Sequence, residues 1–220
     1  MRKFETPAPI AAVLDVPAGR VRVVAAERDD TVVEVQAVDG AKRRDVKAAE
    51  QVAVEFGDGV LRVVAPVENQ YFGPSGAVDV TIHLPAGSRV EAKVAGAEVQ
   101  ATGQLGDVDI VGAHGLVALD EVAGARLALL AGDVTVARLA GPAEISTGKG
   151  DIRITEAVAG AVVLRTEAGD VTVGAAGSAS LDAGTSYGRI HNALKNTEGA
   201  GARLAIQATT TYGDITARSL

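Results

Sequence analysis

The chain has 220 residues, and its 21 Lys and Arg against 28 Asp and Glu give a formal net charge of −7. This balance lacks the basic footprint that a duplex-DNA-binding protein normally shows, so we expect no nucleic-acid partner. The absence of cysteine excludes disulfides, thiolate metal sites and cysteine nucleophiles together. With three Phe, three Tyr and no Trp, the sequence predicts a core of Val, Leu, Ile and Ala.

The first residues faintly imitate a signal peptide. The apolar run at residues 8–14 is too short, Glu5 lies in the basic region, and no cleavage motif follows. A first β-strand is the favoured interpretation, and no stretch is long and apolar enough for a transmembrane helix. We therefore expect a cytoplasmic protein, with peripheral association with a surface left open.

Residues 1–86 predict a β-rich cap region with one short helix. Short alternating strands follow turn signals along this stretch. Residues 52–56 and 60–64 flank Gly-Asp-Gly at residues 57–59, which favours a hairpin. Residues 41–50 are rich in helix formers and predict the helix.

From residue 87 to the C-terminus the chain repeats a short unit. A Pro-Ala-Gly turn at residues 17–19 recurs at 85–87, and from there a glycine returns every eight to ten residues. The glycines with this spacing are Gly87, Gly96, Gly106, Gly115, Gly124, Gly132, Gly141, Gly150, Gly160, Gly169 and Gly177. Each unit is too small to bury its own apolar face, so neighbouring units must cover one another.

A Gly-Asp-[VI]-x-[VI] motif marks every second unit, beginning at Gly132, Gly150 and Gly169, and Gly213-Asp214-Ile215-Thr216 keeps its first part. Its alternation places one set of Val and Ile on a common face, and the repeat length indicates a coil of about 18–19 residues with at least two strands. Residues 87–220 therefore predict an all-β fold, a parallel β-helix or β-solenoid. An antiparallel β-sandwich or prism is the alternative.

Stacking such coils would place acidic side chains in one column, with Arg189 in the remaining position. Neighbouring carboxylates about 5 Å apart repel by roughly 1 kcal/mol in water, so each requires compensation. The favoured interpretation is structural: each carboxylate accepts backbone N–H groups at its own corner, and Arg189 relieves the charge. The alternative is a Ca²⁺ ladder. The cation candidates are Asp133, Asp151, Asp170 and Asp214.

Other possible functional motifs are weaker. Gly184-Thr185-Ser186-Tyr187-Gly188 matches G-x-S-x-G, but a strand is expected after it where a nucleophile elbow needs a helix. Tyr187 and Tyr212 are instead expected to stack on adjacent coils, and together with Arg189 they are the candidate interaction residues. The sequence predicts no catalytic residue and no cofactor. His83, His114 and His191 lack the spacing of a zinc site.

The Leu84-Pro85-Ala86-Gly87 turn, the Gly-Asp units and the closing segment at residues 212–216 together resemble a bacterial β-strand-repeat family. That family is a domain of unknown function labelled "putative adhesin", and the Ala- and Val-rich, lysine-poor composition is similar to that of actinobacterial members. The resemblance spans essentially the whole chain. It implies a fold similar to right-handed parallel β-helix proteins and carries no catalytic residues.

These observations favour a non-enzymatic β-repeat protein that serves as an interaction or self-assembly scaffold. We expect a protein partner or self-association, with a homo-oligomer as one outcome, through a last coil that residues 216–220 leave uncapped. The alternatives are a carbohydrate-binding or carbohydrate-active β-helix protein, for which aromatics are scarce, and a calcium-binding surface adhesin module.

Overall fold

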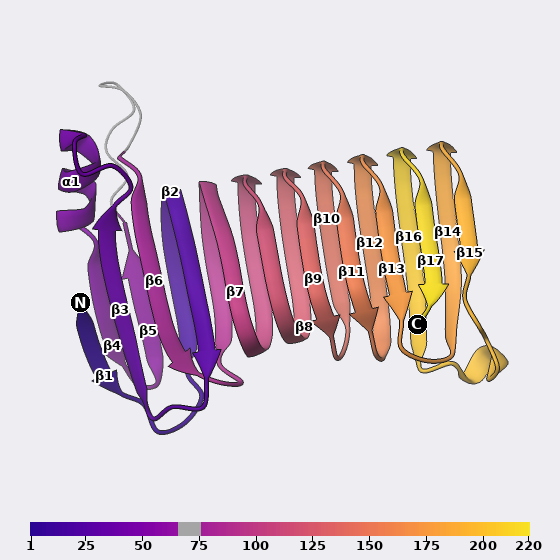
Figure 1. Cartoon of the computed structure of the whole chain (residues 1–220), viewed down its shortest axis with the longest axis horizontal. Helices are drawn as coiled ribbons and strands as arrows, with labels where there is room; N and C mark the ends of the chain where they lie inside the picture. Colours follow the sequence, from indigo (N-terminus) through magenta and orange to yellow (C-terminus); the bar gives the residue numbers. More distant parts are fainter. Residues whose placement is uncertain (66–75) are drawn as a thin grey trace. The chain divides into compact units, whose positions relative to one another are not determined.

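The computed structural model describes residues 1–65 and 76–220, and these residues form an all-β fold with one α-helix (Figure 1). The packing divides the chain into two compact units, Met1–Leu116 and Val117–Leu220. The expected boundary at residue 86, between a cap and the repeats, stays a prediction.

Strand β2 (Ala11–Ala26) lies at the centre of the first unit. It pairs in parallel with β5 (Val60–Val64), β6 (Val78–Pro85) and β7 (Arg89–His114). The turn expected at residues 17–19 is a corner within one continuous strand. Gly19 makes this corner possible, because its φ is +124° and an added Cβ would lie 1.9 Å from a backbone oxygen of β6.

The rest of the first unit is rich in β-strands, and its role as a cap stays a prediction. Strand β3 (Asp30–Ala37) pairs antiparallel with both β1 (Arg2–Glu5) and β6. Strand β4 (Ala53–Gly57) forms the expected hairpin with β5, and its turn residues Asp58 and Gly59 have φ of +51° and +75°, as a type I′ turn requires. The expected helix is α1 (Arg43–Glu50), which packs against β3 and β6.

The second unit is a stack of coils, each made of two strands. Its strands are β8 (Val117–Ala131), β9 (Val134–Leu139), β10 (Ala143–Lys149), β11 (Ile152–Ala157), β12 (Gly160–Ala168), β13 (Val171–Ala175), β14 (Ala179–Tyr187), β15 (Ile190–Ala193), β16 (Leu204–Tyr212) and β17 (Ile215–Ser219). Neighbouring coils pair in parallel, and the register advances by 18 residues from Ala125 to Ala143 and by 19 from there to Val162. The expected parallel stacking with this period is confirmed.

Inward-facing aliphatic side chains form the core of this unit. The alternation predicted from the Gly-Asp motifs holds, because these side chains are at most 1% exposed. They are Val134, Val136, Ile152, Ile154, Val171 and Val173. Each coil thus covers the apolar side chains of the next, as a repeat of this length requires.

The coils do not stack in chain order. The last two strands, β16 and β17, lie between β12–β13 on one side and β14–β15 on the other (Figure 1). The expectation of an uncapped last coil ending at Leu220 was therefore wrong. The uncovered coil is formed by β14 and β15, residues 179–193, which we call the outer coil.

Burial of apolar surface explains this order. The inward positions of β16 are filled by Leu204 and Ile206, which are 0% and 2% exposed. The matching positions of the outer coil are less apolar: Asn192 on β15 aligns with buried Ala217 on β17. Placing the more apolar coil inside buries more hydrocarbon and leaves the asparagine at the solvated end.

Candidate functional site

The Gly-Asp motifs form a row of corners along one side of the second unit. Each corner lies between the first and the second strand of a coil. First strands pair with first strands and second strands with second strands, and we call these two layers the first and the second sheet. The glycine of each corner has a positive φ of 142° to 155°. These glycines are Gly132, Gly150, Gly169 and Gly213. At Gly150, Gly169 and Gly213 an added Cβ would lie 2.0–2.2 Å from the carbonyl oxygen of a glycine on the adjacent coil. Only glycine permits coils to approach this closely.

The aspartates that follow these glycines form a hydrogen-bonded ladder. Asp133 Oδ1 accepts the backbone N–H of Asp151 at 2.9 Å, and Asp151 Oδ1 accepts that of Asp170 at 2.8 Å. Asp170 Oδ1 in turn accepts the backbone N–H of Asp214 at 2.7 Å. The carboxylates thus join one coil to the next, rather than holding N–H groups of their own corner as expected. We call these four residues the Asp ladder.

Arg189 ends the Asp ladder at the outer coil. Its backbone N–H donates to Asp214 Oδ1 at 2.8 Å, and its guanidinium donates to Asp214 Oδ2 at 2.9 Å. This N–H and then the guanidinium hold the pKa of Asp214 below its ordinary value of 3.8. The order along the column is Asp170, Asp214, Arg189, because β17 lies inside β15. The predicted relief of charge by Arg189 is therefore present at one end of the column.

The ladder has no geometry that points to a cation. Among residues 1–65 and 76–220 there is no group of three or more His, Asp or Glu that could hold a metal ion. One oxygen of each aspartate is already occupied by a backbone N–H. The three histidines lie on different strands: His83 on β6, His114 on β7 and His191 on β15.

A second column, which the sequence analysis did not identify, runs beneath the corners. Buried Thr147, Thr166 and Thr210 each donate a hydroxyl hydrogen bond to the carbonyl of a corner glycine on the adjacent coil, at 3.0–3.2 Å. Thr185 makes the same contact from the outer coil. The signal that could have revealed it is a threonine three residues before the corner glycine, as in Thr147 and Gly150.

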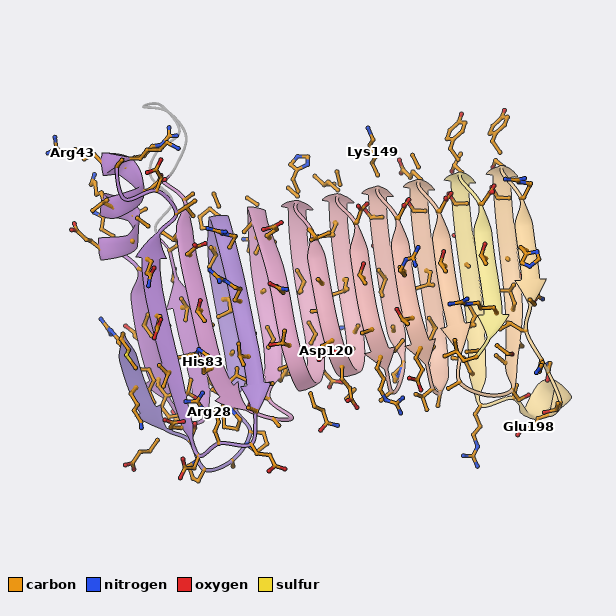
Figure 2. All side chains as sticks on the ribbon, viewed as in Figure 1. Arg28, Arg43, His83, Asp120, Lys149 and Glu198 are labelled. Carbon is orange, nitrogen blue, oxygen red and sulfur yellow. The ribbon has the colours of Figure 1, made fainter. Side chains whose placement is uncertain are left out.

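Two tyrosine rings stack in the open next to this row of corners. The ring centroids of Tyr187 and Tyr212 lie 4.9 Å apart with an interplanar angle of 5°, so the expected stacking on adjacent coils is present. The side chains are 67% and 58% exposed. The same register continues from Tyr212 to Ala168 and then to Lys149, which projects from the end of β10 (Figure 2). Their role in an interaction stays a prediction.

The G-x-S-x-G segment is a corner of the repeat. Gly184 and Ser186 belong to strand β14, and β15 begins two residues after Gly188, so a strand follows where a nucleophile elbow has a helix. Thr185 Oγ1 donates a hydrogen bond to the backbone carbonyl oxygen of Gly213. This segment therefore has the geometry of its neighbours in the stack.

The outer coil is the largest departure from the closed packing of the second unit. Strand β14 pairs with β16 and β15 pairs with β17, and the described residues place no strand on their other side. Leu181 and Leu194 are half-buried and Ile190 is 46% exposed, whereas the apolar side chains inside the neighbouring coil are buried. Backbone edges and apolar side chains are therefore available together at this end.

A family model and one solved structure agree with this architecture, and a second solved structure is similar at a lower score. The family model described as Toastrack DUF4097 matches residues 13–219. A solved structure described as a "putative adhesin" from Bacteroides fragilis is similar with a TM-score of 0.54 and 15% identity, over 98% of this chain and 95% of its own. A "putative adhesin" from Parabacteroides distasonis has a TM-score of 0.44 and 14% identity, over 100% of this chain and 95% of its own. No curated protein matches the sequence.

Proposed function

The chain belongs to the Toastrack DUF4097 family, and from the coil that its fold leaves uncovered we propose that it is a non-enzymatic scaffold that binds protein chains. The observation that carries this proposal is the outer coil: among the described residues, its strands β14 and β15 have a paired strand on one side only. Unpaired N–H and C=O groups along a strand are a template for another strand. The description of the Bacteroides fragilis structure as a "putative adhesin" agrees with a binding role.

The rest of the second unit supports a scaffold rather than a catalyst. The polar side chains of the corners are used in coil-to-coil bonds: the Asp ladder holds backbone N–H groups, and the threonine column holds carbonyls. These polar side chains are therefore already engaged in joining one coil to the next. Within the described residues, no helix is long and apolar enough to cross a membrane.

A lysine on the outer coil tests the proposal. Leu181 faces inward on β14 and is half-buried, so Leu181→Lys places a charge where a docked strand would cover it. The matched control is Leu130→Lys, at a 69% exposed position on β8. Tagged wild-type and variant chains are compared by pull-down from native host extract and by sedimentation velocity.

We expect Leu181→Lys to lose either self-association or the proteins that the wild-type chain captures, while Leu130→Lys keeps both. Circular dichroism melting shows whether each variant is folded. If wild-type chain and Leu181→Lys have the same solution mass and capture the same proteins, the outer coil is not a binding surface and the proposal fails.

The exposed tyrosine pair favours a second candidate, carbohydrate binding. Sugar rings pack on aromatic faces, and the Tyr187 ring has one face on Tyr212 and lies on the outermost coil. A glycan array that compares wild-type chain with Tyr187→Ala and Tyr187→Phe tests it. Binding lost in the alanine variant and kept in the phenylalanine variant would support stacking, whereas no glycan bound by the wild-type chain would end this candidate.

A further inference from the structure

Strand β14 is an edge strand without the usual protection. Natural edge strands carry lysine, proline, bulges or charges that discourage pairing with another chain. The first unit follows this rule, because three of the four residues of its short strand β1 are charged: Arg2, Lys3 and Glu5. In the nine residues of β14 the only side chain charged at neutral pH is Asp182, and there is no proline. Beyond its first residue, Ala179, whose N–H donates to the carbonyl oxygen of Lys195, this edge is therefore open to a partner strand.

The sequence of β14 is complementary to itself when two copies run antiparallel about Ala183. In that register Leu181 lies opposite Thr185 of the second copy, and Asp182 lies opposite Gly184. Each pair sets a larger side chain against a smaller one, and Ser180 meets Ser186. The two residues of each pair are an even number of positions apart in the sequence. A residue that faces inward on one copy therefore lies opposite a residue that faces inward on the other. Both cores would continue across the junction.

A two-fold axis normal to the sheets also preserves the two-layer architecture. Such an axis reverses strand direction and stacking direction while each sheet stays on its own side, so β15 meets β15 as β14 meets β14. Antiparallel pairing then supplies partners for the backbone N–H and C=O groups that the outer coil leaves unpaired. Ile190, which is 46% exposed, would be covered at the same time.

The size of the outer coil is sufficient for a stable contact. A nine-residue strand is about 30 Å long, and two sheets about 10 Å apart measure about 20 Å across with their side chains. The buried area is then about 600 Å² per copy and about 1,200 Å² in total, at the lower end of the range for specific interfaces.

The charge of the outer coil also suits a second copy. The whole chain has a net charge of −7, so two copies repel over most of their surface. The outer coil carries one acidic side chain, Asp182, beside Arg189, which is paired with Asp214, and β15 carries only His191. Contact at this end therefore brings only the two Asp182 carboxylates near each other.

We propose that two copies of this chain associate end to end, through antiparallel pairing of β14 about a two-fold axis at Ala183. This inference rests on the proposed function and names a second copy of the chain as the partner. It also specifies which residues of the two β14 strands lie opposite each other, and a cross-linking experiment can test that register.

Cysteine cross-linking reads this register directly, because the chain contains no cysteine of its own. Residues opposite each other in an antiparallel pair have Cα atoms about 4.5–5.5 Å apart, within the range of a disulfide. Ser180→Cys mixed with Ser186→Cys is therefore expected to give disulfide-linked dimers. Each variant alone should not, because its two copies would lie about 20 Å apart along the strands. Leu130→Cys is the control for random collision.

The expected result is about tenfold more covalent dimer in the mixture than in either variant alone, and a dimer of Ala183→Cys that forms by itself. Equal cross-linking by Ser180→Cys alone and by the mixture would overturn the register. A wild-type chain that stays monomeric at the highest concentration that remains in solution would overturn the second copy as partner. If Leu181→Lys still loses captured proteins in that case, the proposed function stands and a different chain occupies the outer coil.

Discussion

Substitution of Asp151 separates the two roles that a carboxylate plays in the Asp ladder. Its Oδ1 accepts the backbone N–H of Asp170, a hydrogen bond to a charged group that contributes about 2 kcal/mol. Its charge faces carboxylates one coil away on both sides, about 4.8 Å along the stack. In water this gives about 0.9 kcal/mol of repulsion for each neighbour, or about 1 kcal/mol for both together at physiological salt.

The two effects predict different results for two variants. Asp151→Asn keeps a neutral acceptor, so the hydrogen bond weakens by about 1 kcal/mol. Removal of the charge also removes about 1 kcal/mol of repulsion, so the stability of this variant should equal that of wild type within about 0.5 kcal/mol. Asp151→Ala loses the whole hydrogen bond and removes the same repulsion. We expect it to be destabilised by about 1 kcal/mol, which corresponds to a melting temperature lower by about 2–4 °C.

Urea denaturation followed by circular dichroism measures both differences, at low salt and at physiological salt. Repulsion is larger at low salt, so Asp151→Asn should gain stability relative to wild type as salt is removed. A cation bound by the ladder would give the opposite pattern, with Asp151→Asn strongly destabilised and Ca²⁺ stabilising only the wild type. That outcome would refute the structural interpretation of the ladder.

Three further predictions concern the corners. Gly150→Ala should destabilise the fold by about 3 kcal/mol in urea denaturation, because its φ is +142° and a Cβ would lie 2.2 Å from a carbonyl oxygen; Gly177→Ala, where a Cβ meets nothing within 4 Å, is the neutral control. Thr166→Val should cost about 1–2 kcal/mol because the Gly150 carbonyl loses its buried donor, and Thr166→Ser should restore most of it. Arg189 lowers the pKa of Asp214, so the pair stabilises the folded state above pH 3.8. This contribution is lost as the pH falls through the lower pKa that Asp214 has in the folded state. Faster amide exchange in β15 below that pH, absent in Asp214→Asn, would confirm it.

The stack of parallel coils was predictable because its causes are local. A strand of four or five residues with β-branched side chains at every second position can bury one face only, and the glycine spacing sets the coil length. The residues of the Asp ladder followed from the same register, since Asp133, Asp151 and Asp170 are 18 and 19 residues apart. The acceptor geometry did not follow, because a carboxylate at a corner can reach N–H groups on its own coil or on the next.

The order of the coils was not predictable from the repeat. Leu181 comes 19 residues after Val162, the spacing of direct neighbours, yet Ile206 lies between them in the sheet. Every coil presents the same backbone edges, so the pairing rules alone do not distinguish neighbours. The coils differ instead in the apolar surface that their inward-facing side chains bury. Between β14 and β16 this difference amounts to only a few methyl groups.

The connections differ in length. Three residues join β13 to β14 across two coil spacings of about 4.8 Å each. The return from β15 to β16 is ten residues long and includes the short 3₁₀ turn at Gly199–Gly201. Two hydrogen bonds hold this return segment: Ser178 Oγ donates to Asn196 Oδ1, and the backbone N–H of Lys195 donates to Ser219 Oγ. The surface available for assembly is therefore set by the position of the least apolar coil, not by the end of the chain.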